Sequence, residues 1–244
     1  MSKQVLTDCR LFAVAADLSG HSNKIEVSAG HEVKETTNYR SQGWKEVIGG
    51  LGSAEISGEG QWEAGDPSKV DDASWAQLGG VGPWTVCPGD STVGALAYLT
   101  NALRADYKLL DAVGEVAPWS GTAKSSWPLV RGQIAHPPGT ARTASGSGTA
   151  VQLGAVPAGA RLYAALHVLS AAGTTPSLTV SVQSDDAAGM ASPTSRLTFA
   201  AATAAGGQIL RTDGTAITDT YYRATWTVSG TSPSFLFALS LGIR

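Results

Sequence analysis

The sequence predicts a protein built almost entirely of β-strands, with a single α-helix beside them. Apolar and polar residues alternate in two segments near the N-terminus, which is the pattern of half-buried strands. The second half is a series of short apolar runs divided by turn residues, as in antiparallel sandwiches. Only one segment has the flanking residues that begin and end a helix.

The first alternating segment, residues 23–35, predicts a strand with one apolar face. That face carries Ile25, Val27 and Ala29. The side chains between them point the other way, because successive residues of a strand face opposite sides. These are Lys24, Glu26 and Ser28.

The second alternating segment, residues 54–63, predicts a strand with an acidic face. Glu55, Glu59 and Glu63 lie on the same face of this strand, with Ser57 and Gln61 between them. Ile56 and Trp62 occupy the opposite face and are expected to enter the core.

Between these strands, residues 36–52 contain four glycines and predict a long loop, with one helical turn at 44–48. Tyr39 and Trp44 lie in this loop. Aromatic side chains often anchor protein interfaces, so these two are candidate contacts with another subunit.

The helix is expected at 67–78. Asp66, Pro67 and Ser68 supply capping and first-turn residues, an approximate apolar face follows, and Gly79 and Gly80 end it.

From Leu96 the pattern returns to strands. Residues 95–110 also fit a helical spacing at three leucines, but alternation from Leu103 to Leu109 favours a strand. Two further strand-like segments follow before His136.

Composition then changes and divides the chain. Residues 137–150 are rich in Pro, Gly, Ser and Thr, and no Lys or Glu occurs after them. We therefore expect one domain at 1–138, a linker at 139–149, and a β-sandwich at 150–244 that is either a separate outward-facing domain or a completion of the first fold.

Charge and cysteine content limit the functional classes. Only 15% of residues are charged and the net charge is −3, which gives no basis for binding nucleic acid or anionic membranes. The N-terminal apolar patch is too short and too polar for a signal peptide. Cys9 and Cys87 are expected to be free thiols of a cytoplasmically made protein.

The sequence shows no catalytic constellation, so an enzyme is not expected, and neither is a cofactor. None of the four histidines has metal-ligand spacing with another His or Cys, and no phosphate-binding glycine loop or G-x-S-x-G motif occurs. Asp185 and Asp186 are expected to form a turn, since adjacent strand residues point apart. The seven tryptophans are expected to fill cores and interfaces more than a sugar-binding platform.

The order of these elements resembles the major tail (tail tube) proteins of long-tailed bacteriophages, especially those that infect actinobacteria. The segments ADLSGHSNKIEVSAGHEVKETTNY, GWKEVIGGLGSAEISGEGQWEAG and DPSKVDDASWAQLGG carry the resemblance in the first half. SLTVSVQSDDAAGMASPTSRLTF and ITDTYYRATWTVSGTSPSFLFALSLGI carry it in the second. It covers most of the chain and is weakest over residues 80–150.

The resemblance implies a tail-tube β-sandwich or barrel with one flanking helix. Six subunits would close into a ring, and rings would stack into the tube through which DNA leaves the virion, with long loops reaching the next ring. The implied tail is non-contractile (a siphovirus), assembled in the host cytoplasm, with the tape measure and terminator proteins as further partners, DNA passing without specific binding, and no membrane. Glu55, Glu59 and Glu63 are then candidates for the lumen wall. The alternatives are a carbohydrate-binding or adhesin-like module and a capsid decoration or connector protein.

Overall fold

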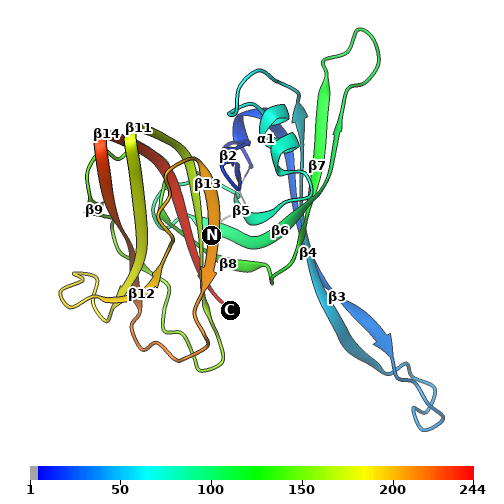
Figure 1. The fold of residues 1–244 in the computed structure, drawn as a ribbon. Helices are drawn as coiled ribbons and strands as arrows, with labels where there is room; N and C mark the ends of the chain where they lie inside the picture. Colours follow the sequence, from blue (N-terminus) through cyan, green and yellow to red (C-terminus); the bar gives the residue numbers. More distant parts are fainter. Residues whose placement is uncertain (1–4) are drawn as a thin grey trace.

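A computed structural model of the protein describes residues 5–244, which form fourteen β-strands, one 3-10 helix and one α-helix (Figure 1). The all-β prediction with one helix is confirmed. In chain order the elements are β1 (Arg10–Ala13), β2 (Ala16–Asp17), the 3-10 helix (Ser19–His21), β3 (Ser22–Glu35), β4 (Val47–Gln61), α1 (Val70–Gln77), β5 (Val81–Cys87), β6 (Leu96–Leu109), β7 (Pro118–Ser125), β8 (Val130–His136), β9 (Gly146–Ser147), β10 (Val151–Gln152), β11 (Leu162–Asp185), β12 (Thr194–Thr198), β13 (Gly206–Arg211) and β14 (Tyr221–Ile243).

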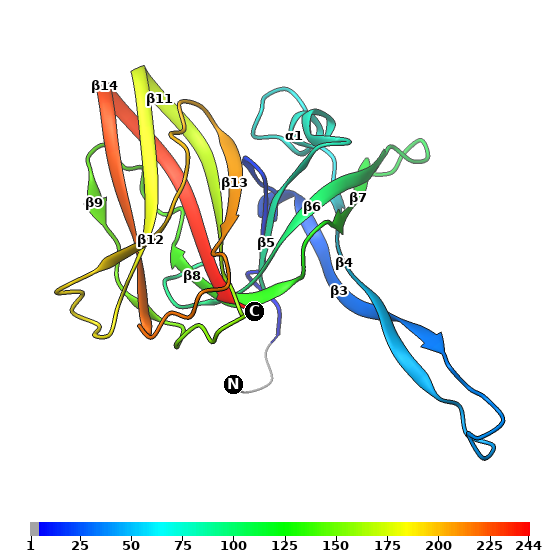
Figure 2. The ribbon, with the colours of Figure 1, turned by 60° about the horizontal axis from the view of Figure 1, so that its bottom comes forward.

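All strands are hydrogen-bonded into one antiparallel network that branches at β6. One edge of β6 pairs with β5, which continues to β1 and β2. On the other edge, residues 102–109 pair with β7 and residues 96–99 pair with β8. The first branch is the four-stranded sheet β3-β4-β7-β6. The second leads through β8 to β14, β11 and their neighbours, which we call the sandwich (Figure 2).

The sandwich is organised by two long strands that bend together. β11 and β14 pair along their length, with register shifts near the middle of both. The bends have nearly the same sequence, Gly-Thr-Thr-Pro-Ser at 173–177 and Gly-Thr-Ser-Pro-Ser at 230–234. Gly173 and Gly230 both have φ near +116°, and a Cβ on either would lie 2.7 Å from a carbonyl oxygen of the other strand. Only glycine fits such a close approach.

These bends correct the sequence prediction for the second half. Four predicted short strands are the two halves of β11 and the two halves of β14. The first half of β11 pairs with β13 and its second half with β12, so each long strand contributes to both layers. The alternation within each run was predicted correctly, but continuity across the bend depends on the partner strand.

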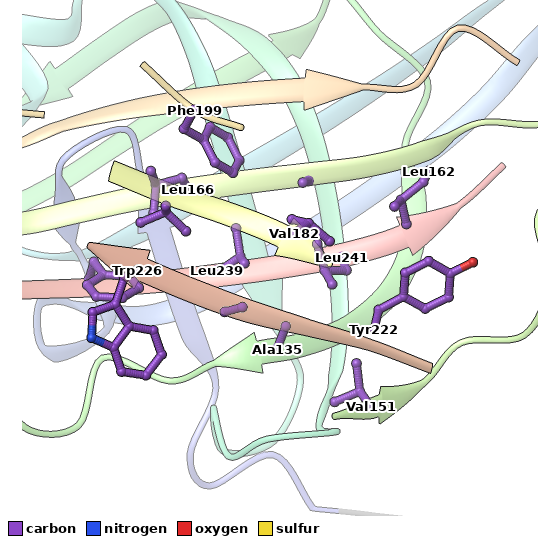
Figure 3. Packing of buried hydrophobic residues seen from close by; sticks show 14 of the residues in the cluster. Ala135, Val151, Leu162, Leu166, Val182, Phe199, Tyr222, Trp226, Leu239 and Leu241 are labelled. Carbon is purple, nitrogen blue, oxygen red and sulfur yellow. The ribbon is translucent and has the colours of Figure 1, made fainter. Parts of the chain in front are cut away.

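The largest core lies between the layers of the sandwich (Figure 3). Its members come from both halves of the long strands and include Leu166, Val182, Tyr222, Trp226, Leu239 and Leu241. A second core lies beneath the four-stranded sheet, where Ile56 and Trp119 pack with Leu11 and with Val70 of α1. Ile56 therefore points inward, as its place in the alternation predicted.

The helix begins three residues later than predicted. Asp66 accepts a hydrogen bond from the Ser68 backbone N–H at 2.9 Å, and its carbonyl oxygen accepts one from Lys69. This turn occupies Pro67 and Ser68, and Lys69 is extended, so α1 starts at Val70. A capping residue can fold its own neighbours into a turn before the helix starts.

The predicted loop at 36–52 is also shorter, and the helical turn at 44–48 does not form. β4 begins at Val47, so Gly49, Gly50 and Gly52 are strand residues. Gly49 and Gly52 pair with β3, and Gly50 lies at the register shift between these pairs. A Cβ on Gly52 would lie 3.0 Å from the ring of His31, its partner across the ladder. Gly50 and Gly52 accommodate side chains of the neighbouring strand, and the connecting tip is residues 36–46.

The two branches share a buried polar contact. His167 of β11 is fully buried, and its Nδ1–H donates to the Val14 carbonyl oxygen at 3.0 Å. Its Nε2 accepts from the Thr85 hydroxyl at 2.8 Å. Thr85 also lies 3.0 Å from the Ser240 hydroxyl. Residues 139–149, predicted as a linker, run beside β14, where Arg142 and Phe235 exchange backbone hydrogen bonds.

A second buried histidine lies where β8 ends. The ring of His136 stacks on Phe237 at 4.1 Å and accepts a hydrogen bond at Nε2 from the Arg142 guanidinium. Burial lowers the pKa of both His136 and His167 to about 4, with Arg142 as a further cause at His136. Both side chains are therefore neutral in the folded protein near pH 7.

We predict that the protein loses stability as pH falls from about 6.5 towards 4. In that window the unfolded chain binds protons at these histidines and the folded protein does not, so stability is complete above pH 6.5 and falls below it. By pH 5 the loss is about 2 kcal/mol per histidine. Urea unfolding at pH 7.5 and 5.0 measures it. His136→Gln should reduce the difference in unfolding free energy between the two pH values, and His31→Gln, at an exposed site, should not. The same difference in the wild type and both variants would contradict the assignment.

Candidate assembly surfaces

The hairpin of β3 and β4 projects from the molecule as an arm (Figures 1 and 2). We define the arm as residues 30–53. Beyond the Ala29–Ala54 pair, the residues of both strands are exposed or half-buried on both faces, and no core lies beneath them. A two-stranded hairpin without a packed face is marginally stable in water. The arm is therefore a surface that a second body would stabilise.

Six large apolar or aromatic side chains of the arm are exposed: Val33, Tyr39, Trp44, Val47, Ile48 and Leu51. Trp44 is 81% exposed and Tyr39 is completely exposed. The two residues predicted as interface anchors therefore lie at the tip and are free of contacts that would bury them. Contiguous exposed apolar surface marks interaction sites in soluble proteins.

Short-range hydrogen bonds give the tip a defined turn. The Asn38 carboxamide oxygen accepts from the Arg40 N–H at 2.9 Å, and the Ser41 hydroxyl accepts from the Asn38 N–H at 3.0 Å. Thr37 accepts from the Glu46 N–H at 3.1 Å. Tyr39 and Trp44 are thus presented outward by a turn whose own polar groups are paired.

The four-stranded sheet has two free edges. β3 pairs only with β4 in the described part of the chain. On the other side, β5 pairs with β6 only as far as Leu103, so residues 105–109 have a neighbour on one edge alone. Free edges present unpaired N–H and C=O groups to another strand.

The outer face of this sheet is polar and carries both signs of charge. Glu55 lies across from Lys124, and Glu59 forms an ion pair with Lys24 at 3.1 Å. The ladder places these charged residues on the outer face: Lys24, Glu26, Glu55, Glu59, Asp106, Lys108 and Lys124. Their sum is −1, and serines and threonines lie between them.

Glu63 is separated from that face. β4 ends at Gln61, so the predicted strand at 54–63 is two residues too long at this end. Glu63 accepts a hydrogen bond from Lys69 at 2.6 Å, just before α1, and this contact lowers the pKa of Glu63. Trp62 donates its indole N–H to Asp71 of the helix at 3.0 Å. The three glutamates do not form one stripe, because the chain turns towards α1.

A second apolar projection was missed by the sequence analysis. The β6–β7 loop, residues 110–117, exposes Leu110, Val113 and Val116, and Val113 is completely exposed. Asp111 and Glu115 lie between them. The only signal was a run of aliphatic residues next to Gly114, which is equally compatible with a strand.

The described residues contain no grouping of three or more His, Cys, Asp or Glu that could hold a metal ion. Asp185 accepts hydrogen bonds from the N–H groups of Ala187 and Ser192, so it forms the predicted turn. Trp84 and Trp119 are buried in the core. No helix in residues 5–244 has the length and apolar character needed to cross a membrane.

No protein-family model matches the chain, and no curated protein matches it. Among solved structures it is similar to a chain of the native gene transfer agent virion, with 20% identity and a TM-score of 0.42 over 52% of this chain and 97% of that one. It is also similar to a chain of the anti-feeding prophage baseplate, with 11% identity and a TM-score of 0.41 over 55% of this chain and 98% of that one. The SPP1 Dit protein of a phage adsorption apparatus is similar with 12% identity and a TM-score of 0.33 over 97% of this chain and 99% of that one.

We predict that Tyr39→Ser with Trp44→Ser abolishes self-association of the protein without unfolding it. Both side chains are exposed, so stability should change by less than about 0.5 kcal/mol. Light scattering after gel filtration measures association, and urea unfolding measures stability. Trp75→Ser, at a comparably exposed tryptophan of α1, is the matched control. An equal loss of association in the control would show general surface stickiness and no specific role for the tip.

Proposed function

We propose that the protein is a structural subunit that polymerises into stacked six-membered rings, forming a bacteriophage tail tube through which DNA is ejected. The observation that supports this most is the four-stranded sheet with its free edges and its unsupported arm. A protein that acts as a monomer would be expected to protect such edges and to cover such an arm. The number six and the phage tail come from the resemblance of the sequence.

Ring closure would use the two edges of the four-stranded sheet. With β3 of one copy beside residues 105–109 of the next, every subunit would add its sheet to a continuous barrel. A closed barrel leaves no strand edge exposed, and this is the standard solution for proteins rich in β-structure. The contact is heterologous, because a different surface is used on each side, so it closes only when the rotation between copies divides a full turn.

The outer face of the sheet would then line the channel. It lies on the opposite side of the molecule from the sandwich (Figures 1 and 2). Lys24 compensates Glu59 there, so the wall would be hydroxylated and weakly acidic, which suits a channel that must not retain DNA. Glu55 and Glu59 are the lumen candidates that this geometry supports, and Glu63 contributes less because Lys69 holds it beside α1.

The sandwich at 150–244 would face outward on such a tube as a decoration. The chain would reside in the virion tail after assembly in the host cytoplasm, with other tail proteins such as the tape measure and terminator as partners. It would act without a cofactor and without catalysis.

Electron microscopy of the purified protein in negative stain tests the proposal. We predict six-fold rings or hollow tubes at high protein concentration. Uniform monomers under all salt conditions would contradict it, and isolated trimers that bind glycans would favour the adhesin-like alternative. Binding to pre-formed capsids without any tubes would favour a decoration protein.

The lumen assignment predicts that tubes carrying Glu55→Lys and Glu59→Lys retain DNA. The exchange changes the wall by four charges per subunit, and lysines that contact phosphates release counterions, so retention should fall steeply with salt. Co-sedimentation of a short labelled duplex with tubes, from 50 to 300 mM NaCl, measures it. Asp186→Lys with Asp213→Lys on the sandwich is the charge-matched control. A duplex blocked at both ends by a bulky protein label cannot enter the channel, so its retention reports binding to the exterior. Equal retention by both sets of tubes would place Glu55 and Glu59 outside the lumen.

A further inference from the structure

A groove of about 1370 Å³ lies between α1 and the sandwich. The helix contributes Ala73, Ala76 and Gln77 to one wall. The sandwich contributes Leu169, Gly206 and Leu236 to the other, and the turn from β1 to β2 also lines it. Its volume exceeds the roughly 300–1,000 Å³ of small-molecule sites, and an open groove of this size suits a segment of polypeptide.

The groove is apolar inside and acidic at its rim. Aliphatic residues, prolines and glycines make up just over half of its lining residues. Asp17, Asp66, Asp72 and Asp90 line it as well, and Arg10 is the one cation among the lining residues, already paired with Asp8 and Asp17. The lining groups therefore sum to −3. A ligand with an apolar centre and cationic flanks would complement this arrangement.

One wall of the groove also holds an unused hydrogen-bond acceptor. Gln77 donates its amide Nε2–H to the Ala13 carbonyl oxygen at 3.0 Å. Its other atom, Oε1, is buried and has no partner within residues 5–244. A buried acceptor without a partner is costly, and native proteins usually satisfy it by an interaction.

We propose that this groove receives the arm tip, residues 36–46, of a second copy of the chain. The inference rests on the proposed function and adds to it the acceptor surface for the arm. The tip exposes Trp44 and Tyr39 as apolar anchors, and Arg40 and Lys45 flank them. Aromatic and arginine side chains are the most frequent energetic centres of interfaces.

Two comparisons on the same chain select this occupant. The only other apolar projection described above, residues 110–117, carries Asp111 and Glu115 and so has a charge of −2, which the acidic rim would repel. The tip has a charge of +1, from Arg40 and Lys45 against Glu46. The chain's own tip lies at the end of the arm remote from α1 in both views (Figures 1 and 2), so the donor is another molecule.

The geometry of the arm permits such a contact. From Ala29 to Glu35 the paired ladder extends about 20 Å beyond the core, at roughly 3.3 Å per residue. Tip and groove are different surfaces of one chain, so each copy would donate one arm and receive one. When the rotation between copies does not close a ring, contacts of this kind propagate along an axis, as stacking requires.

Charge reversal tests the pairing. We expect Arg40→Glu with Lys45→Glu, and separately Asp72→Lys with Asp90→Lys, each to raise the critical concentration for polymerisation about tenfold at low salt. The chain that carries all four substitutions should return close to the wild-type value, which a merely structural defect would not do. Pelleting assays over a concentration series give these values. Asp186→Lys with Asp213→Lys controls for total charge. Unchanged polymerisation of the groove variant, or no rescue in the combined chain, would overturn the inference.

Two cysteine probes separate this inference from the proposed function. Ala76→Cys should react with a maleimide in the monomer and be protected in the polymer. Gln42→Cys with Ala76→Cys should form a disulfide between copies, and Gln42→Cys with Ala188→Cys should not. If tubes form but Cys at position 76 stays reactive and uncrosslinked, the groove is not the acceptor and the tube function stands. If no tubes form, the proposed function fails, and the presence or absence of the cross-link in concentrated protein still decides the groove.

Discussion

Backbone pairing along β6 is the interaction on which the rest of the structure depends. Its C-terminal part carries the four-stranded sheet through β7, and its N-terminal part carries the sandwich through β8, while β5 occupies the other edge. The two branches are therefore held at a fixed relation by one strand. The groove between α1 and the sandwich exists because the branches diverge from this strand.

A buried arginine reinforces β6 on the side of the helix. Arg104 is 1% exposed, and its guanidinium lies 5.3–5.9 Å from the rings of Trp84, Tyr107 and Trp119. It donates to the Ser74 hydroxyl of α1 at 2.8 Å. Burial lowers its pKa to about 10, so it remains charged at neutral pH and is stabilised by the aromatic faces around it. This contact fixes α1, and hence one wall of the groove, against the sheet.

The arm and the compact body follow opposite physical rules. In the body, apolar side chains are buried between layers, and polar groups such as His167 find partners. In the arm, Trp44 and its neighbours remain in water and both strand faces are open. Folding alone does not account for that arrangement, since a hairpin gains little from it. The association proposed above would supply the missing contacts, both for the arm and for the free edges of β3 and β6.

The sequence by itself determined the local features of this protein. Alternation placed β3, β4 and β6 and assigned Ile56 to the core side, because the two-residue period of a strand is a local property.

Tertiary structure alone decided where those strands end and which segments they pack against. Glu63 left the face of β4 because the chain turns to α1, and the loop glycines became strand residues because β3 lies beside them. The long strands β11 and β14 are continuous because their bends pair with each other. The two bend glycines, Gly173 and Gly230, are 57 positions apart in the sequence. The groove joins residues from the first, middle and last parts of the chain. Contacts between segments so far apart leave no periodic signal in either segment, so only the folded molecule brings them together.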